Sequence, residues 1–379
     1  MAIANPNTET ATITFNFTDS TGADFGNGTT TIAAGGQIAK FLNQDPFNSG
    51  DNVNGTFTFT SDVPVSVVAL RGLSNERGDF LITTLPVAPL ATTATATGFF
   101  PHFADGGWTT QVILVNPTDG TLTGNVQFFS QASGTAAGSP AMVTVDGVTA
   151  SSFAYSIPGR SSRRFPTSGT PTATTAGSAR IVPDGGTTTP SGLGVFSFKP
   201  GQFTVAEAGV PLLEPAPAVR MYAESASPVQ TGVAVANPSS TPATVTFELT
   251  TLAGVSTGLT GTATIPGDGQ IAKFLDQISG FENLTTPFQG VLRITTTSTA
   301  GLSIVGLRGR TNSRGDFLIT TTSPVDENAT ASTAEQLFPH FAAGGGWSTQ
   351  LILFAGSGTT TGGDLRFLSQ AGQLIDVTN

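Results

Sequence analysis

The amino-acid sequence predicts an all-β protein built from tandem antiparallel β-sandwich domains. Three observations lead to this prediction: a composition rich in strand and turn formers, apolar residues that alternate at period two, and a long internal repeat. The repeat also predicts that the last domain of the array is incomplete.

The composition favours folded β-structure. Hydrophobic residues make up 38% of the chain and charged residues 11%, whereas disorder requires low hydrophobicity together with high net charge. Thr, Gly, Val, Ala, Ser and Phe dominate while Lys, Glu and Met are scarce, a balance that favours strands and tight turns over helices. A length of 379 residues suits two to four domains.

Composition also excludes several classes of function. The chain has no cysteine, so disulfides, thiolate metal sites and cysteine nucleophiles are excluded. A net charge of −10 with only 15 Lys plus Arg disfavours nucleic acid as a partner. No apolar stretch is long enough to span a membrane, so we expect no membrane insertion. Residues 1–6 show no secretory leader, so an extracellular protein would have lost one or been excised from a larger protein.

Local patterns indicate strands rather than helices. Residues 12–17 and 244–249 alternate apolar and polar side chains, as expected for strands with one buried and one wet face. Residues 67–70 and 112–115 are continuously apolar, which is typical of better covered strands. Only the repeated word GQIAKFL could form one helical turn.

Three words of the first half return in the second half at an offset of roughly 235 residues, which indicates duplication of a long unit. They are GQIAKFL at 36–42 and 269–275, RGDFLITT at 77–84 and 314–321, and FPHFA at 100–104 and 338–342. The third word is followed each time by a glycine run and a tryptophan.

A fainter likeness lies inside the unit. Residues 111–117 (QVILVNP) and 230–238 (QTGVAVANP) each read as a strand that ends in an Asn-Pro turn before a second strand. The unit is therefore predicted to hold two related domains of ~90–120 residues, a size suited to a sandwich of seven or eight strands.

The repeat divides the chain into four parts, joined by short Pro- and Ala-rich linkers. They are residues 1–96, a β-sandwich without its lead segment; 97–215, a β-sandwich; 216–333, a repeat of the first; and 334–379, a partial domain with the lead segment and first hairpin of the second.

These words carry a family resemblance. The Asn-Pro hairpin and the three repeated words resemble uncharacterised tandem repeats of large secreted bacterial proteins, and the domains resemble immunoglobulin-like or fibronectin-III-like sandwiches. The resemblance covers nearly the whole chain and implies a tandem immunoglobulin-like fold, but it carries no catalytic residues. Unlike antibody domains, the chain lacks the cysteine pair.

Two Arg-Gly-Asp triplets resemble integrin-binding loops: Arg77, Gly78 and Asp79, and Arg314, Gly315 and Asp316. The alternative is a hairpin turn, in which the glycine supplies a permissive backbone and Arg71 or Arg77 pairs with Asp79. Because each triplet lies between two predicted strands, the hairpin turn is the favoured interpretation.

The two histidines and two tryptophans share one repeated motif: His102 with Trp108, and His340 with Trp347. We expect these aromatic side chains to pack at interfaces between neighbouring domains. The alternative is that the tryptophans stack on sugar rings. No further histidine or acidic cluster accompanies either motif, so no metal is expected.

No enzyme chemistry is predicted. Neither histidine lies near a nucleophile-elbow motif, and acids such as Asp45 and Asp51 lie in Gly/Asn-rich turns, where they are typical turn formers rather than a glycosidase pair. No catalytic residue and no cofactor is therefore expected. Lys40 and Lys273 could form isopeptide cross-links only beside a buried acid, which the sequence does not indicate.

The sequence thus predicts a rod-like extracellular structural or adhesive protein, secreted or on the cell surface. Its expected partners are copies of itself or a cell-surface or matrix component. The ragged ends suggest a filament subunit that lends strands head-to-tail; equally, the chain could be a fragment of a longer repeat protein. The alternative function is a carbohydrate-binding array that uses Trp108 and Trp347 on a polysaccharide.

Overall fold

The prediction of an all-β protein is confirmed. The computed structural model describes residues 1–51, 53–90, 96–132, 135–329, 334–354 and 362–377. These residues form 26 strands, β1 to β26, and one 3-10 turn, η1, without any α-helix. Within this described part, no helix is long and apolar enough to cross a bilayer.

Domain 1 (residues 1–90) packs two antiparallel sheets, β3-β2-β5 and β4-β1-β6-β7, face to face. Its core joins Ile3 of one sheet to Phe15 and Phe17 of the other. The strands are β1 Ala2–Ala4, β2 Ala11–Asp19, β3 Asp24–Ile32, β4 Gln37–Ala39, β5 Gly55–Ser61, β6 Ser66–Ser74 and β7 Phe80–Leu85.

Domain 2 (residues 96–215) pairs sheets β13-β10-β15-β8 and β14-β9-β16-β17, with the small hairpin β11-β12 beside them. Phe103, Val112 and Phe128 are fully buried in its core. The strands are β8 Gly98–Asp105, β9 Trp108–Val115, β10 Leu122–Ser130, β11 Val143–Val145, β12 Val148–Ala150, β13 Ser152–Ile157, β14 Ser162–Pro166, β15 Thr175–Pro183, β16 Ser191–Phe198 and β17 Ala206–Pro211.

Domain 3 (residues 216–329) has strand orders β21-β20-β23-β18 and β22-β19-β24-β25, which a short β18-β19 pairing links, while β26 adds to β18. In this domain, residues 270–274 of the repeated word GQIAKFL form a strand, and the last residue of the word, Leu275, begins a 3-10 turn. The elements are β18 Ala218–Ala226, β19 Val229–Ala236, β20 Ala243–Thr251, β21 Ser256–Ile265, β22 Gln270–Phe274, η1 Leu275–Gln277, β23 Phe288–Thr296, β24 Ser303–Thr311, β25 Phe317–Thr322 and β26 Val325–Asp326.

The two main sheets have the same strand order in all three domains, except at one edge of domain 1. In domains 2 and 3, the lead strands β8 and β18 pair with β15 and β23. In domain 1, the counterpart of β15 and β23 is β5. It pairs with β2, and in the described part of the chain no strand pairs with its other edge. Domain 1 therefore has an open sheet edge where the other two are closed.

A buried asparagine fixes the same turn in every domain. Asn5, Asn116 and Asn237 are each only 1% exposed. Each Nδ2 donates to backbone carbonyls at the far end of the hairpin, such as those of Ile32, Ile157 and Ile265 at 3.0, 2.9 and 3.1 Å. The Asn-Pro turn thus ties the first strand of one sheet to the other sheet, since these carbonyls would otherwise be buried without a partner.

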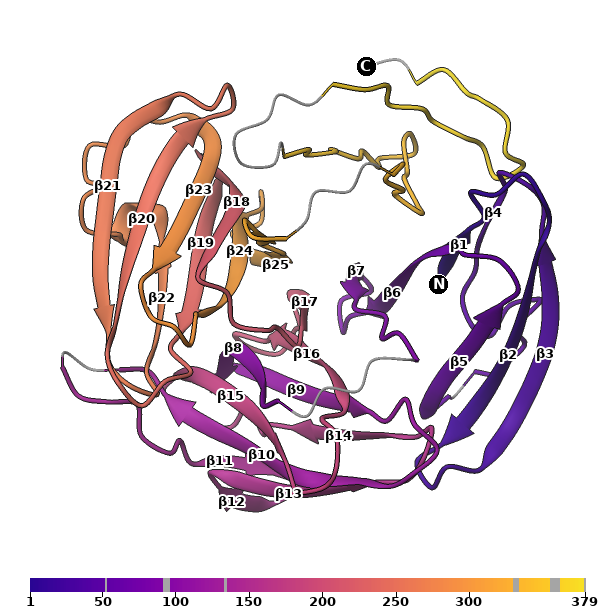
Figure 1. Cartoon of the computed structure of the whole chain (residues 1–379), viewed down its shortest axis with the longest axis horizontal. Helices are drawn as coiled ribbons and strands as arrows, with labels where there is room; N and C mark the ends of the chain where they lie inside the picture. The colour runs from indigo at the N-terminus through magenta and orange to yellow at the C-terminus, as the bar shows by residue number, and fades with distance from the viewer. Residues whose placement is uncertain (52, 91–95, 133–134, 330–333, 355–361, 378–379) are drawn as a thin grey trace.

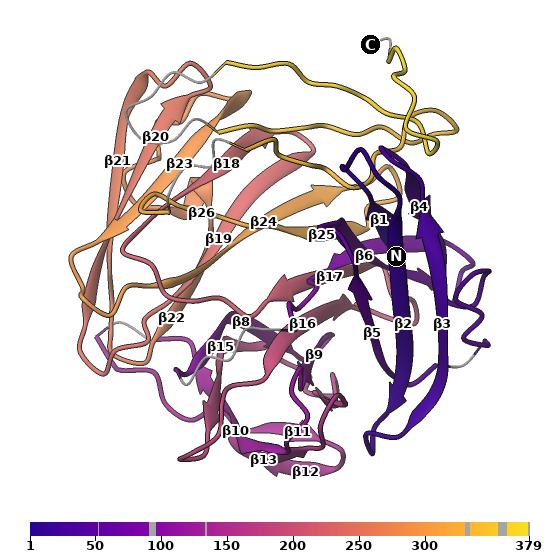
Figure 2. The same cartoon turned by 45° about the vertical axis from the view of Figure 1, so that its right-hand side comes forward.

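The domains form a ring rather than the predicted rod (Figure 1). Edge strands β7, β17 and β25 of the three domains come together near its centre, where β17 contacts both of the others (Figure 2). Rod-like stacking fails because the last strand of domain 2 packs against two domains at once, which bends the chain back on itself.

The C-terminal segment (residues 334–354 and 362–377) lies across the opening between domain 3 and domain 1 (Figure 1). It contains isolated bridges, Gly344 to Trp347 and Leu368 to Leu374, but no strand within its described residues. In its described residues, the predicted first hairpin of a fourth domain therefore forms no sheet.

Candidate functional site: contacts between domains

The two Arg-Gly-Asp triplets occupy equivalent turns, between β6 and β7 and between β24 and β25. Gly78 and Gly315 take φ values of +81° and +83°, a left-handed conformation that glycine adopts without strain. In the first turn, Asn75 Oδ1 accepts hydrogen bonds from the backbone N–H groups of Arg77 and Asp79. Asn312 makes the same two bonds in the second turn, so both turns are rigid.

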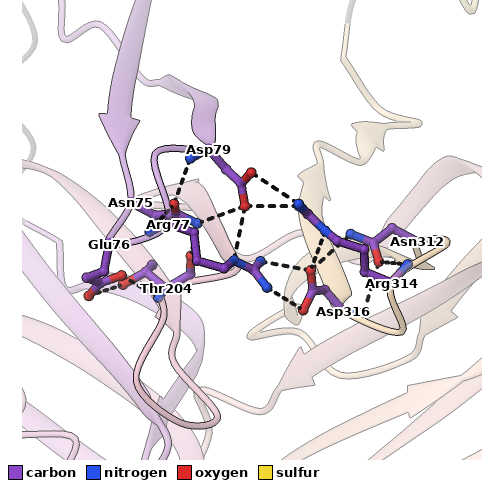
Figure 3. A network of polar contacts seen from close by, with 8 residues as sticks. All are labelled: Asn75, Glu76, Arg77, Asp79, Thr204, Asn312, Arg314 and Asp316. Carbon is purple, nitrogen blue, oxygen red and sulfur yellow. Dashed lines mark hydrogen bonds and ion pairs between the residues drawn. The ribbon is translucent and has the colours of Figure 1, made fainter.

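These turns face each other and exchange ion pairs (Figure 3). Arg77 Nη2 donates to Asp316 Oδ2 at 2.8 Å, and Arg314 Nη2 donates to Asp79 Oδ2 at 2.9 Å. Each guanidinium also donates through Nη1 to the second carboxylate oxygen, which makes both pairs bidentate. We call these four residues the arginine clasp. Its contact is isologous, because each turn offers the other what it receives.

Ion pairing stabilises the charged forms of Arg77, Asp79 and Asp316 in the clasp. Hydrogen bonding from Arg314 lowers the pKa of Asp79, and hydrogen bonding from Arg77 lowers the pKa of Asp316. Conversely, Asp316 raises the pKa of Arg77. Both triplets are therefore engaged with one another. Arg77 also bonds Asp79 at 3.1 Å, whereas Arg71 pairs with Glu207 of domain 2 and not with Asp79.

Beside the arginine clasp, hydrogen bonds and an ion pair join domain 1 to domain 2 (Figure 3). Asn75 Nδ2 donates to the Thr204 carbonyl at 2.8 Å, and Glu76 accepts from Thr204 N at 2.7 Å. Glu76 also pairs with Lys199. The Lys199 ammonium lowers the pKa of Glu76 to about 2. The Glu76 carboxylate therefore stays ionised at neutral pH.

Strand β17 connects three domains through one glycine. Gly209 N donates to Thr83 Oγ1 of domain 1 at 3.1 Å, and the Gly209 carbonyl accepts from Thr321 Oγ1 of domain 3. A Cβ at Gly209 would lie 2.1 Å from the Thr84 carbonyl oxygen. Only glycine therefore allows domain 1 to approach this closely.

Domains 2 and 3 share a continuous apolar core. Ala234, Val305 and Leu307 of domain 3 are buried within the core cluster of domain 2. At the rim, Arg180 pairs with Asp268 at 2.6 Å, and its guanidinium lies 4.3 Å from the ring centroid of Phe129. This interface therefore buries apolar side chains as well as joining charges.

His102 lies in the same interface. Gln270 Nε2 and His102 Nδ1 are 3.0 Å apart; since the amide nitrogen only donates, Nδ1 accepts and the proton is on Nε2. The ring also packs edge-on against Phe196 at 5.4 Å. Burial lowers the pKa of His102 to about 4, so the imidazole is neutral at neutral pH. His340 makes the matching contact with Gln37, also at 3.0 Å.

The two tryptophans differ in their surroundings. Trp108 is half-buried and stacks on Phe198 within domain 2, with ring centroids 4.2 Å apart. Trp347, on the glycine turn of the C-terminal segment, is 52% exposed. The histidines thus contact neighbouring domains, whereas Trp108 packs inside its own.

The acidic side chains singled out in the sequence are exposed and bond to nearby asparagines. Asp45 and Asp51 contact Asn48 and Asn43 respectively. Among the described residues, no group of three His, Asp or Glu side chains could hold a metal ion.

Sequence reasoning missed most of the residues that join the domains. Arg180, Asp268 and Gly209 gave no signal, because their partners lie 57 or more residues away. Gln37 and Gln270 belong to the GQIAKFL repeat. Because the histidines also recur in a repeated motif, the sequence could have suggested that each glutamine pairs with a histidine. Comparison with protein-family models, curated proteins and solved structures found no match for this chain.

Proposed function

We propose that this chain is an extracellular structural or adhesive repeat protein of tandem immunoglobulin-like sandwiches, which assembles head-to-tail by adding a β-strand of one copy to a sheet edge of the next. The partner in this proposal is a second copy of the chain. The chain's charged and aromatic residues support a structural role, since the arginine clasp, Arg180 and His102 all hold its own domains together.

The observation that carries the proposal is the open edge of β5. Its counterparts β15 and β23 each pair on both sides, whereas β5 pairs with β2 alone in the described part of the chain. Seven residues long, it alternates threonine with the half-buried Phe57 and Phe59. An unpaired strand edge without a charged residue is a template for strand addition.

Electron microscopy of the purified protein at high concentration tests this proposal. We expect filaments from the parent chain and none from Thr60→Lys, because a charge on β5 blocks edge pairing. The matched control is Thr295→Lys on β23, whose edge β18 already covers; it should still form filaments. Uniform monomers of the parent chain would eliminate strand lending.

Carbohydrate binding is the second candidate, favoured by one observation. Trp347 presents an exposed indole on a glycine turn, and such a face can stack on a sugar ring. A polysaccharide pull-down with the parent chain, Trp347→Ala and Trp108→Ala decides it: binding lost only in Trp347→Ala supports this function, and no binding by the parent chain rejects it.

A further inference from the structure

The geometry points to a vacant domain position in the ring. We propose that the C-terminal segment is the first part of a second domain of the domain 2 type, placed on domain 1 as domain 2 is placed on domain 3. The occupant of the open position is then the set of strands that follows these residues in such a domain, the counterparts of β13 to β17. This inference goes beyond the proposed filament and concerns a different face of domain 1.

The contacts of the segment with domain 1 repeat those between domains 2 and 3. His340 bonds Gln37 as His102 bonds Gln270, both at 3.0 Å. A backbone hydrogen bond joins corresponding stretches in each pair, with donor and acceptor exchanged: Gln37 N donates to the Gln370 carbonyl at 2.9 Å, whereas the Gln270 carbonyl accepts from Ala132 N at 3.2 Å. The side-chain bond is thus the same in both pairs and the backbone bond joins corresponding neighbours, so the segment meets domain 1 where domain 2 meets domain 3.

Inside the segment, the local packing of domain 2 is reproduced as well. The rings of Phe341 and Phe367 meet edge-to-face at 5.2 Å, as those of Phe103 and Phe128 do at 5.1 Å. The hydroxyl of Thr349 bonds both N and O of Ala342, which repeats the bonds of Thr110 to Ala104. These local contacts of domain 2 are therefore already present in the segment, although its described residues form no strand.

Apolar residues of the C-terminal segment are exposed where their counterparts in domain 2 are buried. Leu114 and Val126 are fully buried in domain 2, whereas their counterparts Leu353 and Leu365 are 68% and 52% exposed. In domain 2, β13 and β15 pair with β10, and β14 and β16 pair with β9, and residues from β13 to β17 share one core with Leu114 and Val126. An exposed apolar face of this kind marks an interaction surface.

Domains 1 and 3 also provide a surface on which the missing strands could pack. The arginine clasp relates them as two equivalent partners, and domain 2 fills the space on one side of it only. On the filled side, Thr83 is 7% exposed beneath Gly209; its counterpart Thr320 on domain 3 is exposed. Likewise Arg77, which lies over Phe203, has a side chain 25% exposed, against 55% for Arg314.

The required occupant follows from the filled side. Domain 2 covers Val305 and Leu307, whereas their counterparts Val68 and Leu70 are only half-buried. It reaches the centre of the ring with a strand whose glycine, Gly209, passes a threonine backbone too closely for any side chain. The vacant position therefore fits strands with the apolar pattern of domain 2 and a glycine at this point.

The test extends the full chain by a second copy of residues 141–215, joined after residue 379. The register is set by the repeat, because Ala371 corresponds to Ala132 and eight residues follow each before the junction. In a Trp108→Phe background Trp347 is the sole tryptophan, since the added strands contain none. We expect its acrylamide quenching to fall about twofold, because the indole stacks on the added copy of Phe198.

Two further measurements complete the test. Amides of residues 349–354 and 365–368 should become protected from hydrogen exchange in the extended chain, which should be monomeric by light scattering. A control chain with Gly209→Val in the added copy should keep Trp347 as open as in the parent chain. Unchanged quenching and exchange would overturn the proposal, as would a dimer whose added strands dock on a second copy. Because the readout is taken on dilute monomers, an absence of filaments leaves it unaffected.

Discussion

Domains 1 and 3 are copies of one sequence unit, yet their interiors differ. Ile304 and Val305 of domain 3 are 4% and 0% exposed, whereas Val67 and Val68 of domain 1 are half-buried. Gln270 is fully buried, while Gln37 is not. The side chains are nearly the same, so the difference comes from their neighbours: domain 3 has a lead strand and all of domain 2 against it.

The comparison shows which features belong to the repeat and which belong to the assembly. The Asn-Pro turn and the Arg-Gly-Asp turn are equally well formed in both copies, because their bonds close within a few strands. Burial of the face that includes Leu70 or Leu307 depends on another domain. Substitutions in matched pairs can separate the two contributions.

The largest expected effect comes from the buried asparagines, and it should be equal in both copies. Asn237→Ala and Asn5→Ala each leave buried carbonyls without a donor, and we expect each to lower the free energy of unfolding by about 3 kcal/mol. Chemical denaturation of both variants measures this. A much smaller cost in domain 1 would mean that the turn depends on the surrounding assembly.

The next effect should differ between the copies. Leu307→Ala removes a side chain from the core shared with domain 2 and should cost about 2 kcal/mol, whereas Leu70→Ala, on the half-buried counterpart, should cost about 1 kcal/mol or less. Thermal and urea unfolding of the two variants provide the comparison. Equal losses would show that neighbouring domains do not set the burial of this face.

The smallest effect concerns pH at the filled interface. Below pH 6.5 the unfolded chain protonates His102, whereas the folded chain, with a pKa of about 4, resists protonation. Stability should therefore fall as the pH drops from 6.5 to 4, by about 1 kcal/mol for a partly exposed ring. The stability of His102→Gln relative to the parent chain should rise over that range. A difference that does not vary with pH would contradict the neutral imidazole of the folded chain.

Several elements of the fold could be read from sequence because their cause is local. Alternating residues such as those at 12–17 and 244–249 mark strands with one buried face, and they lie in β2 and β20. The Arg-Gly-Asp triplets fall at turns because apolar runs flank them. What the pattern could not give was the partner: Arg77 meets Asp316, 239 residues away, and no local signal encodes that distance.

The candidate site was predicted only in part for the same reason. The repeated motif indicated that His102 and His340 have equivalent roles, but it did not identify the glutamines that bond them. The predicted rod assumed neighbouring domains in line, whereas the contacts of Gly209 with Thr83 and Thr321 bend the array into a ring.

By itself, the sequence determined that this chain makes β-strands, where its turns fall and which parts are copies of each other, because these features depend on residue type and short spacing. Only the tertiary structure decided that the copies meet through the arginine clasp, that domain 2 fills one side of it and that the other side is open. Contacts between domains join residues that are far apart in the chain, and their geometry depends on the packing of whole sheets.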